Sequence, residues 1–232
     1  FRPISLCNMV YKVISKLLAN HLKFILTEII SPNQSAFVPG RLITDYFLVA
    51  FECYHAIKKK SSGKYGTCAV KLDMHKAYDR VEWNFLETIL LRLGFNASWV
   101  DLIMECVRSV KYQVRINNSF FDYFVPTRGL RQGDPLSTYV FLLCAKGLSS
   151  MITYEEEAGN LVGVKVCRNA PSVNHLLFAD DFLILMRVDA TNATSLRRAL
   201  DDYCAASGQL VSDAKSSIFF SPCTPVEVRA EV

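Results

Sequence analysis

The sequence predicts an α+β fold, in which helices pack on one face of a ferredoxin-like antiparallel sheet. Apolar residues recur at helical spacing over residues 8–30, which is typical of a long amphipathic helix. A short β-compatible segment follows at residues 67–72. Further along, two short apolar segments at 175–178 and 182–186 flank a three-residue turn, as expected of a strand hairpin.

Helices are predicted from apolar periodicity and from the residues that start and stop them. Pro32 disfavours helix at the residue before it, and Gly94 and Gly208 suit left-handed helix ends. Pro135 is tolerated in a first helical turn and opens another helix. The predicted helical ranges are 8–30, 44–60, 81–93, 98–109, 135–156 and 191–206.

Strands are predicted where short β-compatible runs are bounded by turn residues. The segment 112–124 alternates in hydropathy and has Asn117 and Asn118 in its middle, which is the pattern of a hairpin. The remaining predicted strands cover residues 67–72, 161–166, 175–178, 182–186 and 218–220.

The composition is that of a globular protein. The chain has 232 residues, of which 51% are hydrophobic and 21% are charged, enough for one large domain or two small ones. The longest apolar stretch, residues 139–148, is too short to span a membrane and is interrupted by Lys146. The N-terminal residues do not have the pattern of a signal peptide. We therefore expect no membrane partner, and because the chain starts at Phe1 we expect a piece of a longer protein.

The net charge and the spacing of the cysteines restrict which partners and which cysteine sites are expected. The net charge of +4 permits a polyanionic partner but does not demand one. The eight cysteines form no C-x-x-C pair, and most lie in apolar runs. This spacing disfavours a disulfide framework or a zinc site, and buried free thiols are expected instead.

The adjacent carboxylates Asp180 and Asp181 are the first candidate site. They lie between two apolar segments, where an unpaired charge would be costly to bury. A hairpin tip lets both reach solvent or a cation, and a divalent ion would stabilise two carboxylates that otherwise repel each other. An ordinary Asp-rich turn explains this segment equally well.

Asp73 adds a third carboxylate at the end of an apolar strand. If that strand neighbours the strand of Asp180, three carboxylates converge, which suits an oxygen-preferring ion such as Mg²⁺. Two such ions roughly 3.5 to 4 Å apart would clamp the attacking and leaving oxygens of a phosphoryl transfer. By contrast, Asp201 and Asp202 lie in a polar helical segment and are interpreted as a solvated face.

A series of motifs resembles that of a known protein family. The motifs are RPISL (2–6), SPNQSAFVPGR (31–41), KLDMHKAYDRVEW (71–83), RGLRQGDPLS (128–137), FADD (178–181) and SGQLVSDAKS (207–216). Their order and spacing resemble the reverse transcriptases of LINE-type, non-long-terminal-repeat retrotransposons, from residue 1 to about residue 220. FADD alone would be a weak signal, but its combination with the two motifs before it is specific.

This resemblance implies a fold, a division and an activity. It implies a reverse transcriptase palm with part of the fingers, in which residues 1–66 belong to the fingers and residues 67–232 form the palm. The thumb and the N-terminal finger strands are expected outside this chain. The implied activity is RNA-directed DNA polymerisation, with Mg²⁺ (or Mn²⁺) as cofactor and an RNA template, a DNA primer and deoxynucleoside triphosphates (dNTPs) as partners.

The resemblance also implies roles for individual residues. The implied catalytic and metal-binding groups are the carboxylates of Asp73, Asp180 and Asp181 and the main-chain carbonyl of Met74. The implied dNTP-binding residues are Tyr78, Gln132, Gly133, Arg2 and Lys215. The implied nucleic-acid-binding residues are Arg41, Arg128 and Arg131.

Some of these roles come with a specific chemical reason and a plainer alternative. A Tyr78 ring under the incoming sugar would clash with a 2′-hydroxyl and so select deoxynucleotides, whereas the alternative is core packing beside Ala77. Lys215 is implied to protonate the pyrophosphate leaving group, and the alternative is an exposed lysine. Arginine suits phosphate because its planar fork donates two hydrogen bonds, and solvent exposure is the alternative for Arg128 and Arg131.

The sequence departs from the usual family pattern at four positions, which are His75, Thr138, Phe182 and Ser212. None of them removes an implied metal ligand. They leave open that this chain is an inactive nucleic-acid-binding remnant of such an element.

Related palm polymerases are a further alternative. A large residue at Tyr78 disfavours an RNA-dependent RNA polymerase, and the segment 31–41 disfavours a group II intron maturase. From the resemblance we also expect an endonuclease domain in the parent protein and an intracellular, nuclear location at the insertion step. The oligomeric state and the target site stay open.

Overall fold

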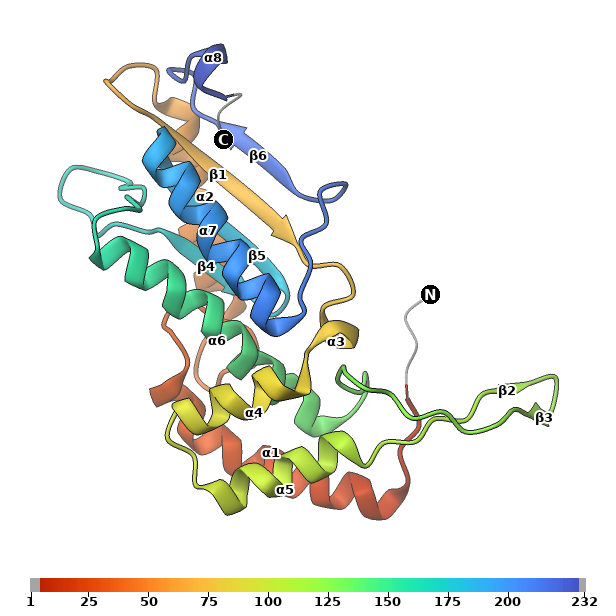
Figure 1. Cartoon of the computed structure of the whole chain (residues 1–232). Coiled ribbons are helices and arrows are strands. Elements are labelled where there is room, and N and C mark those ends of the chain that lie inside the picture. Colours follow the sequence, from red (N-terminus) through yellow and green to blue (C-terminus); the bar gives the residue numbers. More distant parts are fainter. Residues whose placement is uncertain (1–4, 230–232) are drawn as a thin grey trace.

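Residues 5–229 are described in the computed structural model, and their elements are labelled in Figure 1. The helices are α1 (Met9–Ile29), α2 (Ile43–Lys59), α3 (Ala77–Arg80), α4 (Trp83–Arg92), α5 (Ala97–Arg108), α6 (Pro135–Glu157), α7 (Ala190–Ser207) and α8 (Val226–Arg229). The strands are β1 (Gly66–Asp73), β2 (Arg115–Ile116), β3 (Ser119–Phe120), β4 (His175–Phe178), β5 (Asp181–Val188) and β6 (Ser217–Phe220). This mixed content confirms the predicted α+β class.

The main sheet has the strand order β4-β5-β1-β6, and every neighbouring pair is antiparallel. The pairing of β1 with β5 runs along the whole of both strands, from Gly66 opposite Val188 to Asp73 opposite Asp181. The antiparallel sheet is therefore confirmed, and its two central strands both have an aspartate at the same end.

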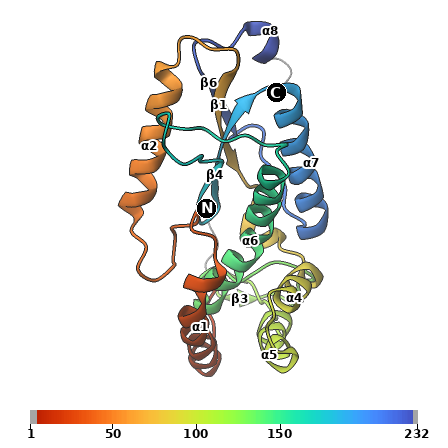
Figure 2. The same cartoon turned by 90° about the vertical axis from the view of Figure 1, so that its left-hand side faces the viewer.

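Helices cover both faces of this sheet, which corrects the prediction of helices on one face only. Along β1, Cys68, Val70 and Leu72 belong to the larger core, whereas Ala69 belongs to a second core beneath α2. Figure 2 shows α2 on one side of the sheet and α6 and α7 on the other. The physical reason lies in runs such as 182–186, which are apolar at consecutive positions, so that both faces need to be covered.

Helix α6 is the central helix of the larger core. It begins at Pro135, and the Asp134 side chain before it accepts a hydrogen bond from the Leu136 N–H. It packs against α1, α4 and α7. By length and apolarity α6 would be able to cross a membrane, but 61% of the relevant window is buried inside the protein. Its apolar composition is therefore accounted for by its place in the core.

Two predicted elements differ from the structure. The predicted helix 81–93 is preceded by the short helix α3, and the chain is extended at Val81 and Glu82 before α4 begins. The predicted strand 161–166 is wrong, because this segment makes only an isolated bridge between Val164 and Val173. The Val162 carbonyl accepts a hydrogen bond from the Arg187 N–H of β5, but the Val162 N–H donates to the side chain of Asn192, so no continuous ladder forms here.

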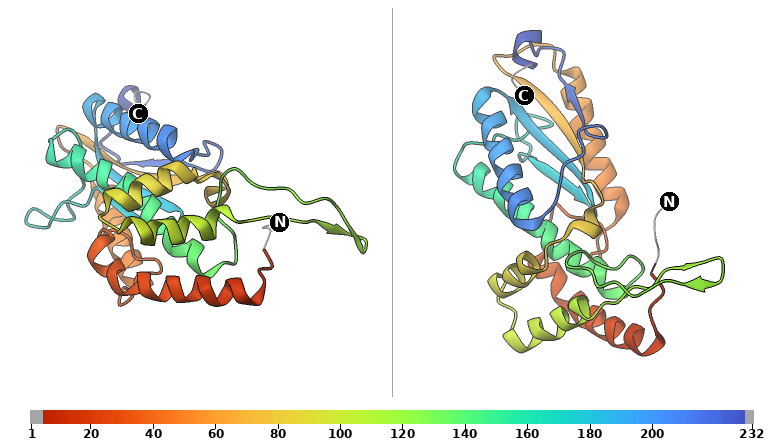
Figure 3. Two further views of the ribbon diagram at one scale, coloured as in Figure 1. Left: turned by 60° about the horizontal axis from the view of Figure 1, so that its bottom comes forward. Right: turned by 45° about the vertical axis from the view of Figure 1, so that its right-hand side comes forward.

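The predicted hairpin at 112–124 is confirmed. Its strands β2 and β3 are joined through Asn117 and Asn118, which both have positive φ, of 47° and 68°. Two left-handed residues are what a tight hairpin turn requires, and asparagine tolerates that conformation well. Figure 3 shows this hairpin projecting from the body of the protein.

Candidate active site

The two central strands place Asp73 and Asp181 directly opposite each other. The two residues are Cα partners at the last position of the β1–β5 pairing. Side chains alternate along a strand, and Leu72 and Phe182 point into the larger core, so both aspartates point to the face covered by α2. Directly opposite residues in an antiparallel pair have Cβ atoms roughly 4.5 to 5.5 Å apart. The two carboxylates therefore share one face and one end of the sheet.

Asp180 lies in the turn between β4 and β5. Ala179, just before it, has a left-handed backbone with φ of 55°. Burial raises the pKa of the Tyr78 phenol, and the charge of Asp180 raises it further, whereas a hydrogen bond with Thr138 lowers it. Asp180 is thus within electrostatic reach of Tyr78, and the structure brings all three predicted carboxylates to one end of the sheet.

Two lysines lie beside these carboxylates. The Lys215 Nζ is 3.7 Å from the Asp73 Oδ1, and the Lys71 Nζ is 3.9 Å from the Asp181 Oδ1. Both lysine side chains are more than half exposed, at 66% and 52%. Within residues 5–229, no three Asp, Glu, His or Cys side chains stand close enough to form a ready-made metal-binding group. Shared coordination of one ion by the three carboxylates therefore stays a prediction.

The donor set nevertheless suits a hard divalent cation. Carboxylate oxygens are the preferred ligands of Mg²⁺, which usually keeps several waters and takes only one or two protein carboxylates. The carbonyl of Asp73 accepts the Ser212 N–H, and the N–H of His75 bonds to the Leu210 carbonyl. Met74 and Val211 are thus a non-hydrogen-bonded pair of this antiparallel bridge, so the main-chain N–H and carbonyl of Met74 point away from residues 210–212. This geometry fits the implied role of the Met74 carbonyl.

Tyr78 lies on the short helix α3 that follows β1. Its ring stacks on Phe141 of α6, with centroids 4.7 Å apart and an interplanar angle of 12°. The main-chain carbonyl of Tyr78 accepts the Leu130 N–H at 2.8 Å. The Tyr78 ring is therefore held against the core by Phe141, and the Tyr78 backbone is held by the loop that contains Gln132.

That loop is held close to the segment after β1. Gly129 has φ of 91°, and a Cβ atom there would lie 2.8 Å from the Asp79 carbonyl oxygen. The Gln132 Nε2 donates to the Asp79 Oδ1 at 3.4 Å, and Gly133 has φ of 96°. Glycine permits both the close approach and the left-handed backbone. The structure thus brings Gln132 and Gly133 near Tyr78, as the implied nucleotide site requires.

The arginines predicted to bind nucleic acid are engaged within the chain. Arg41 donates hydrogen bonds to the main-chain carbonyls of Ile30, Ser31 and Gln34. Arg131 lies over the Tyr11 ring at 3.8 Å. It also donates to a main-chain carbonyl of α5. Both guanidinium groups therefore have partners within the chain, and nucleic-acid binding by Arg41 and Arg131 stays a prediction.

Arg128 and Arg2 were also predicted to bind nucleic acid or nucleotide. Arg128 forms a half-exposed ion pair with Glu82 at 3.3 Å and keeps part of its guanidinium in solvent. Arg2 lies outside the residues that the structure describes.

Sequence reasoning missed Lys71 and Gln34. Lys71 had a usable signal, because a residue two positions before Asp73 in a strand must share its face. Gln34 lies in the motif SPNQSAFVPGR (31–41), but nothing in that motif indicates its partner. Its Oε1 accepts the N–H of Ala179, a contact between segments 145 residues apart in the sequence.

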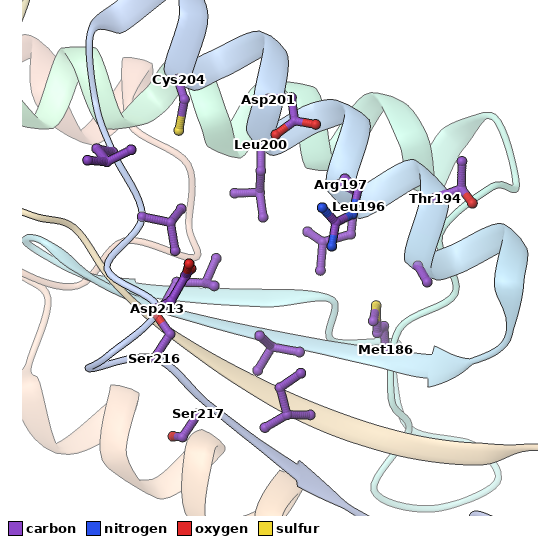
Figure 4. Close-up of a pocket in the computed structure, with 16 residues that line it drawn as sticks. Met186, Thr194, Leu196, Arg197, Leu200, Asp201, Cys204, Asp213, Ser216 and Ser217 are labelled. Carbon is purple, nitrogen blue, oxygen red and sulfur yellow. The ribbon is translucent and has the colours of Figure 1, made fainter. Parts of the chain in front are cut away.

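Among the hollows near the sheet, two are of similar volume. One, of about 600 Å³, runs along α2 beside Asp181 and is lined mainly by aromatic and aliphatic side chains, including Tyr46, Phe47 and Phe178. Burial, with a contribution from the charge of Asp181, raises the pKa of Tyr46 to about 12. The other, of about 610 Å³, lies between α7 and strands β1 and β6 and is bordered by Asp213, as Figure 4 shows. The three carboxylates do not line this second hollow.

Comparison with known proteins identifies the family. Residues 1–229 match the family described as reverse transcriptase (RNA-dependent DNA polymerase). The Transposon TX1 uncharacterized 149 kDa protein of Xenopus laevis is 29% identical over 217 residues, which make up 94% of this chain and 16% of that protein. A Retrovirus-related Pol polyprotein from the type-1 retrotransposable element R2 of Nasonia vitripennis is 26% identical over 198 residues, or 85% of this chain and 18% of that protein.

Solved structures show the same fold. Telomerase from Candida albicans, in complex with a fragment of telomeric RNA, matches with a TM-score of 0.61 at 14% identity, covering 92% of this chain and 36% of that chain. The chain spans only 16% and 18% of the lengths of the two relatives above. The motif resemblance to LINE-type enzymes is confirmed by these matches, and the chain belongs to the reverse transcriptase (RNA-dependent DNA polymerase) family.

Proposed function

We propose that this chain is the catalytic core of an RNA-directed DNA polymerase that adds deoxynucleotides to a primer 3′-hydroxyl during retrotransposition. The observation that carries the proposal is the placement of Asp73 opposite Asp181, with Asp180 in the adjoining turn. Family membership supports the reaction class, and the full polymerase is expected to need the rest of the parent protein.

The proposed cofactor is Mg²⁺, for which Mn²⁺ can substitute. Asp73, Asp180 and Asp181 would hold it together with the Met74 carbonyl. When bound, the ions would lower the pKa of the attacking hydroxyl and neutralise charge on the triphosphate. The Lys71 and Lys215 ammonium groups now balance part of the carboxylate charge, so metal binding has to displace or outweigh them.

The protein's own residues would position the substrate and move one proton. The Tyr78 ring, backed by Phe141, forms a rigid surface for the sugar and excludes a 2′-hydroxyl. The Lys215 ammonium lies next to Asp73, from where it would donate a proton to the departing pyrophosphate. Most of the rate would then come from positioning and charge neutralisation.

The proposed partners are an RNA template, a DNA primer and dNTPs. A protein reads such a duplex through its shape and backbone, while base pairing carries the sequence. Binding should therefore weaken steeply with salt. An endonuclease domain in the parent protein and a nuclear site of action complete the proposal, as expected for an inserting element.

A second candidate function is a nucleic-acid-binding remnant without catalysis. The observation that favours it is that Asp73 and Asp181 each have a lysine within 4 Å, while the described residues form no ready-made metal group. Such a chain would keep the fold and bind nucleic acid without extending a primer.

Primer extension separates the two candidates. In the full-length protein that contains this chain, Asp180→Asn should abolish extension on a primed RNA template with Mg²⁺. Asp201→Asn is the matched control, because it removes an exposed carboxylate on α7, and it should extend like the wild type. Equal extension by Asp180→Asn and wild type would rule out the proposed mechanism, and no extension by the wild type would favour the remnant.

A further inference from the structure

We propose that Gln34 is a positioning residue that fixes the turn carrying Asp180 and Asp181. The inference rests on the proposed function, because it assigns Gln34 a role in placing the metal-binding carboxylates. Gln34 belongs to the loop between α1 and α2 and does not itself reach the reacting atoms.

The side chain of Gln34 is buried, with 1% of its surface exposed. Its Oε1 accepts two main-chain hydrogen bonds, from Ala36 at 3.0 Å and from Ala179 at 3.1 Å. Both partners are N–H donors, so only the oxygen of the amide can face them, and the orientation of the amide is fixed by chemistry. One oxygen atom therefore ties a loop near the N-terminus to the turn before Asp180.

Ala179 needs such support. Its φ of 55° places it in the left-handed region, which is uncommon for residues other than glycine and costs free energy. Such conformations persist only when the surroundings hold them in place. The hydrogen bond from Ala179 to Gln34 is a direct restraint on this residue, and the next residue along the chain is Asp180.

The backbone around Gln34 is fixed to the same strand. Gln34 and Leu177 form a parallel bridge, in which Leu177 donates to the Asn33 carbonyl at 2.8 Å and accepts from Ser35 at 3.1 Å. Arg41 in turn holds the ends of this loop through main-chain carbonyls. The loop is thus a rigid brace along β4, and the Gln34 side chain extends the brace to the turn.

The nitrogen of the Gln34 amide, unlike its oxygen, makes no hydrogen bond within the described residues. This Nε2 atom is nevertheless buried. A buried donor without a partner is destabilising, so the amide gains less stability than a fully bonded one. A role in holding the turn accounts for an amide at this position, since only its oxygen is needed.

The predicted functional effect falls on the chemical step. Loss of the hydrogen bond between Gln34 and Ala179 would let the turn relax and move the Asp180 carboxylate away from the metal position. A misplacement of about 1 Å can cost a catalysed step roughly 100-fold. The dNTP would still be bound by Tyr78 and by base pairing, so its KM should change little.

The test compares two isosteric deletions of a buried amide in the full-length protein. Gln34→Met removes the oxygen that accepts from Ala179. Asn192→Leu is the matched control, because the Asn192 side chain is also fully buried and accepts one main-chain N–H, from Val162, near the opposite end of β5. If Gln34→Met does not fold, Gln34→Asn takes its place, since it keeps an amide that is one methylene too short to reach Ala179.

Two readouts are measured on each variant. For primer extension, Gln34→Met should lower kcat by about 10- to 100-fold, raise the Mg²⁺ concentration for half-maximal rate, and leave the dNTP KM within about threefold. Asn192→Leu should leave kcat within about twofold. Hydrogen exchange of the peptide spanning residues 176–181, read by mass spectrometry, should speed up at least tenfold in Gln34→Met and stay unchanged in Asn192→Leu.

The two readouts test the proposed function and the role of Gln34 separately. Faster exchange without polymerase activity in the wild type would sink the proposed function but keep the brace. Unchanged exchange in Gln34→Met, or a kcat equal to that of Asn192→Leu, would overturn the role of Gln34 even in an active polymerase.

Discussion

Asp73 and Asp181 face each other across β1 and β5, and each has a lysine beside it. The distances are 3.7 Å from the Lys215 Nζ to Asp73 and 3.9 Å from the Lys71 Nζ to Asp181. Exposed ion pairs of this kind contribute little to stability. The two lysines therefore matter mainly for the positive charge that they place beside the carboxylates, and a bound divalent ion would take over that role.

Removing the Lys71 charge should strengthen metal binding. We predict that Lys71→Gln tightens Mn²⁺ binding by about two- to fivefold, because the ammonium no longer competes for Asp181. Its free energy of unfolding should stay within about 0.5 kcal/mol of the wild type. The measurements are a Mn²⁺ titration followed by electron paramagnetic resonance and a denaturant unfolding curve.

Lys111→Gln is the control for this prediction, since it removes the same charge from an exposed residue between α5 and the projecting hairpin. It should leave Mn²⁺ affinity unchanged. Weaker binding by Lys71→Gln would show that the lysine supports the site instead of competing for it.

The stacked Tyr78 ring should set the choice of sugar. We predict that Tyr78→Val lowers discrimination against ribonucleotides by about 10- to 100-fold, because it removes the surface that a 2′-hydroxyl would strike. The measurement is the ratio of kcat/KM for a dNTP and the matching ribonucleotide. An unchanged ratio would assign Tyr78 to core packing on Phe141 alone.

His175 should make the stability of this chain depend on pH. It is fully buried and hydrogen-bonded to Ser149, Asn33 and Asn174, and burial, with a smaller effect of Lys146, lowers its pKa from 6.5 to about 4. Between these two values the unfolded chain binds a proton that the folded chain does not. Stability is therefore present above pH 6.5 and is lost as the pH falls toward 4.

The full effect of a pKa change of this size is at most about 3 kcal/mol. We predict that His175→Gln unfolds with a shallower pH dependence than the wild type between pH 6.5 and 4. Urea unfolding curves at several pH values measure this difference. Parallel curves for the two proteins would show that the imidazole is not the group responsible.

Much of the fold was predictable because local signals and burial agreed. Helix α6 starts at Pro135 as predicted and ends one residue beyond its predicted end. The strands around the FADD motif were predictable because two apolar runs flank a short turn there. Burial of both faces of the sheet was also predictable, since five consecutive apolar residues at 182–186 indicate a strand that is covered on both sides.

The errors come from contacts between distant segments. No local pattern reveals that the Val162 N–H donates to the Asn192 side chain, while the Val162 carbonyl accepts from β5 and Val164 pairs with Val173 alone. In the site, the motifs indicated which carboxylates lie at this end of the sheet, whereas the lysines beside them and the Gln34 contact with Ala179 depend on three-dimensional pairing.

Divalent metal binding is the most direct test of the central claim. A calorimetric titration of the full-length protein with Mn²⁺ should show binding that weakens at least tenfold in Asp73→Asn and in Asp180→Asn, while Asp201→Asn binds like the wild type. Equal affinity in all four proteins would contradict the account, because it would mean that the carboxylates at the ends of β1 and β4–β5 do not hold the ion.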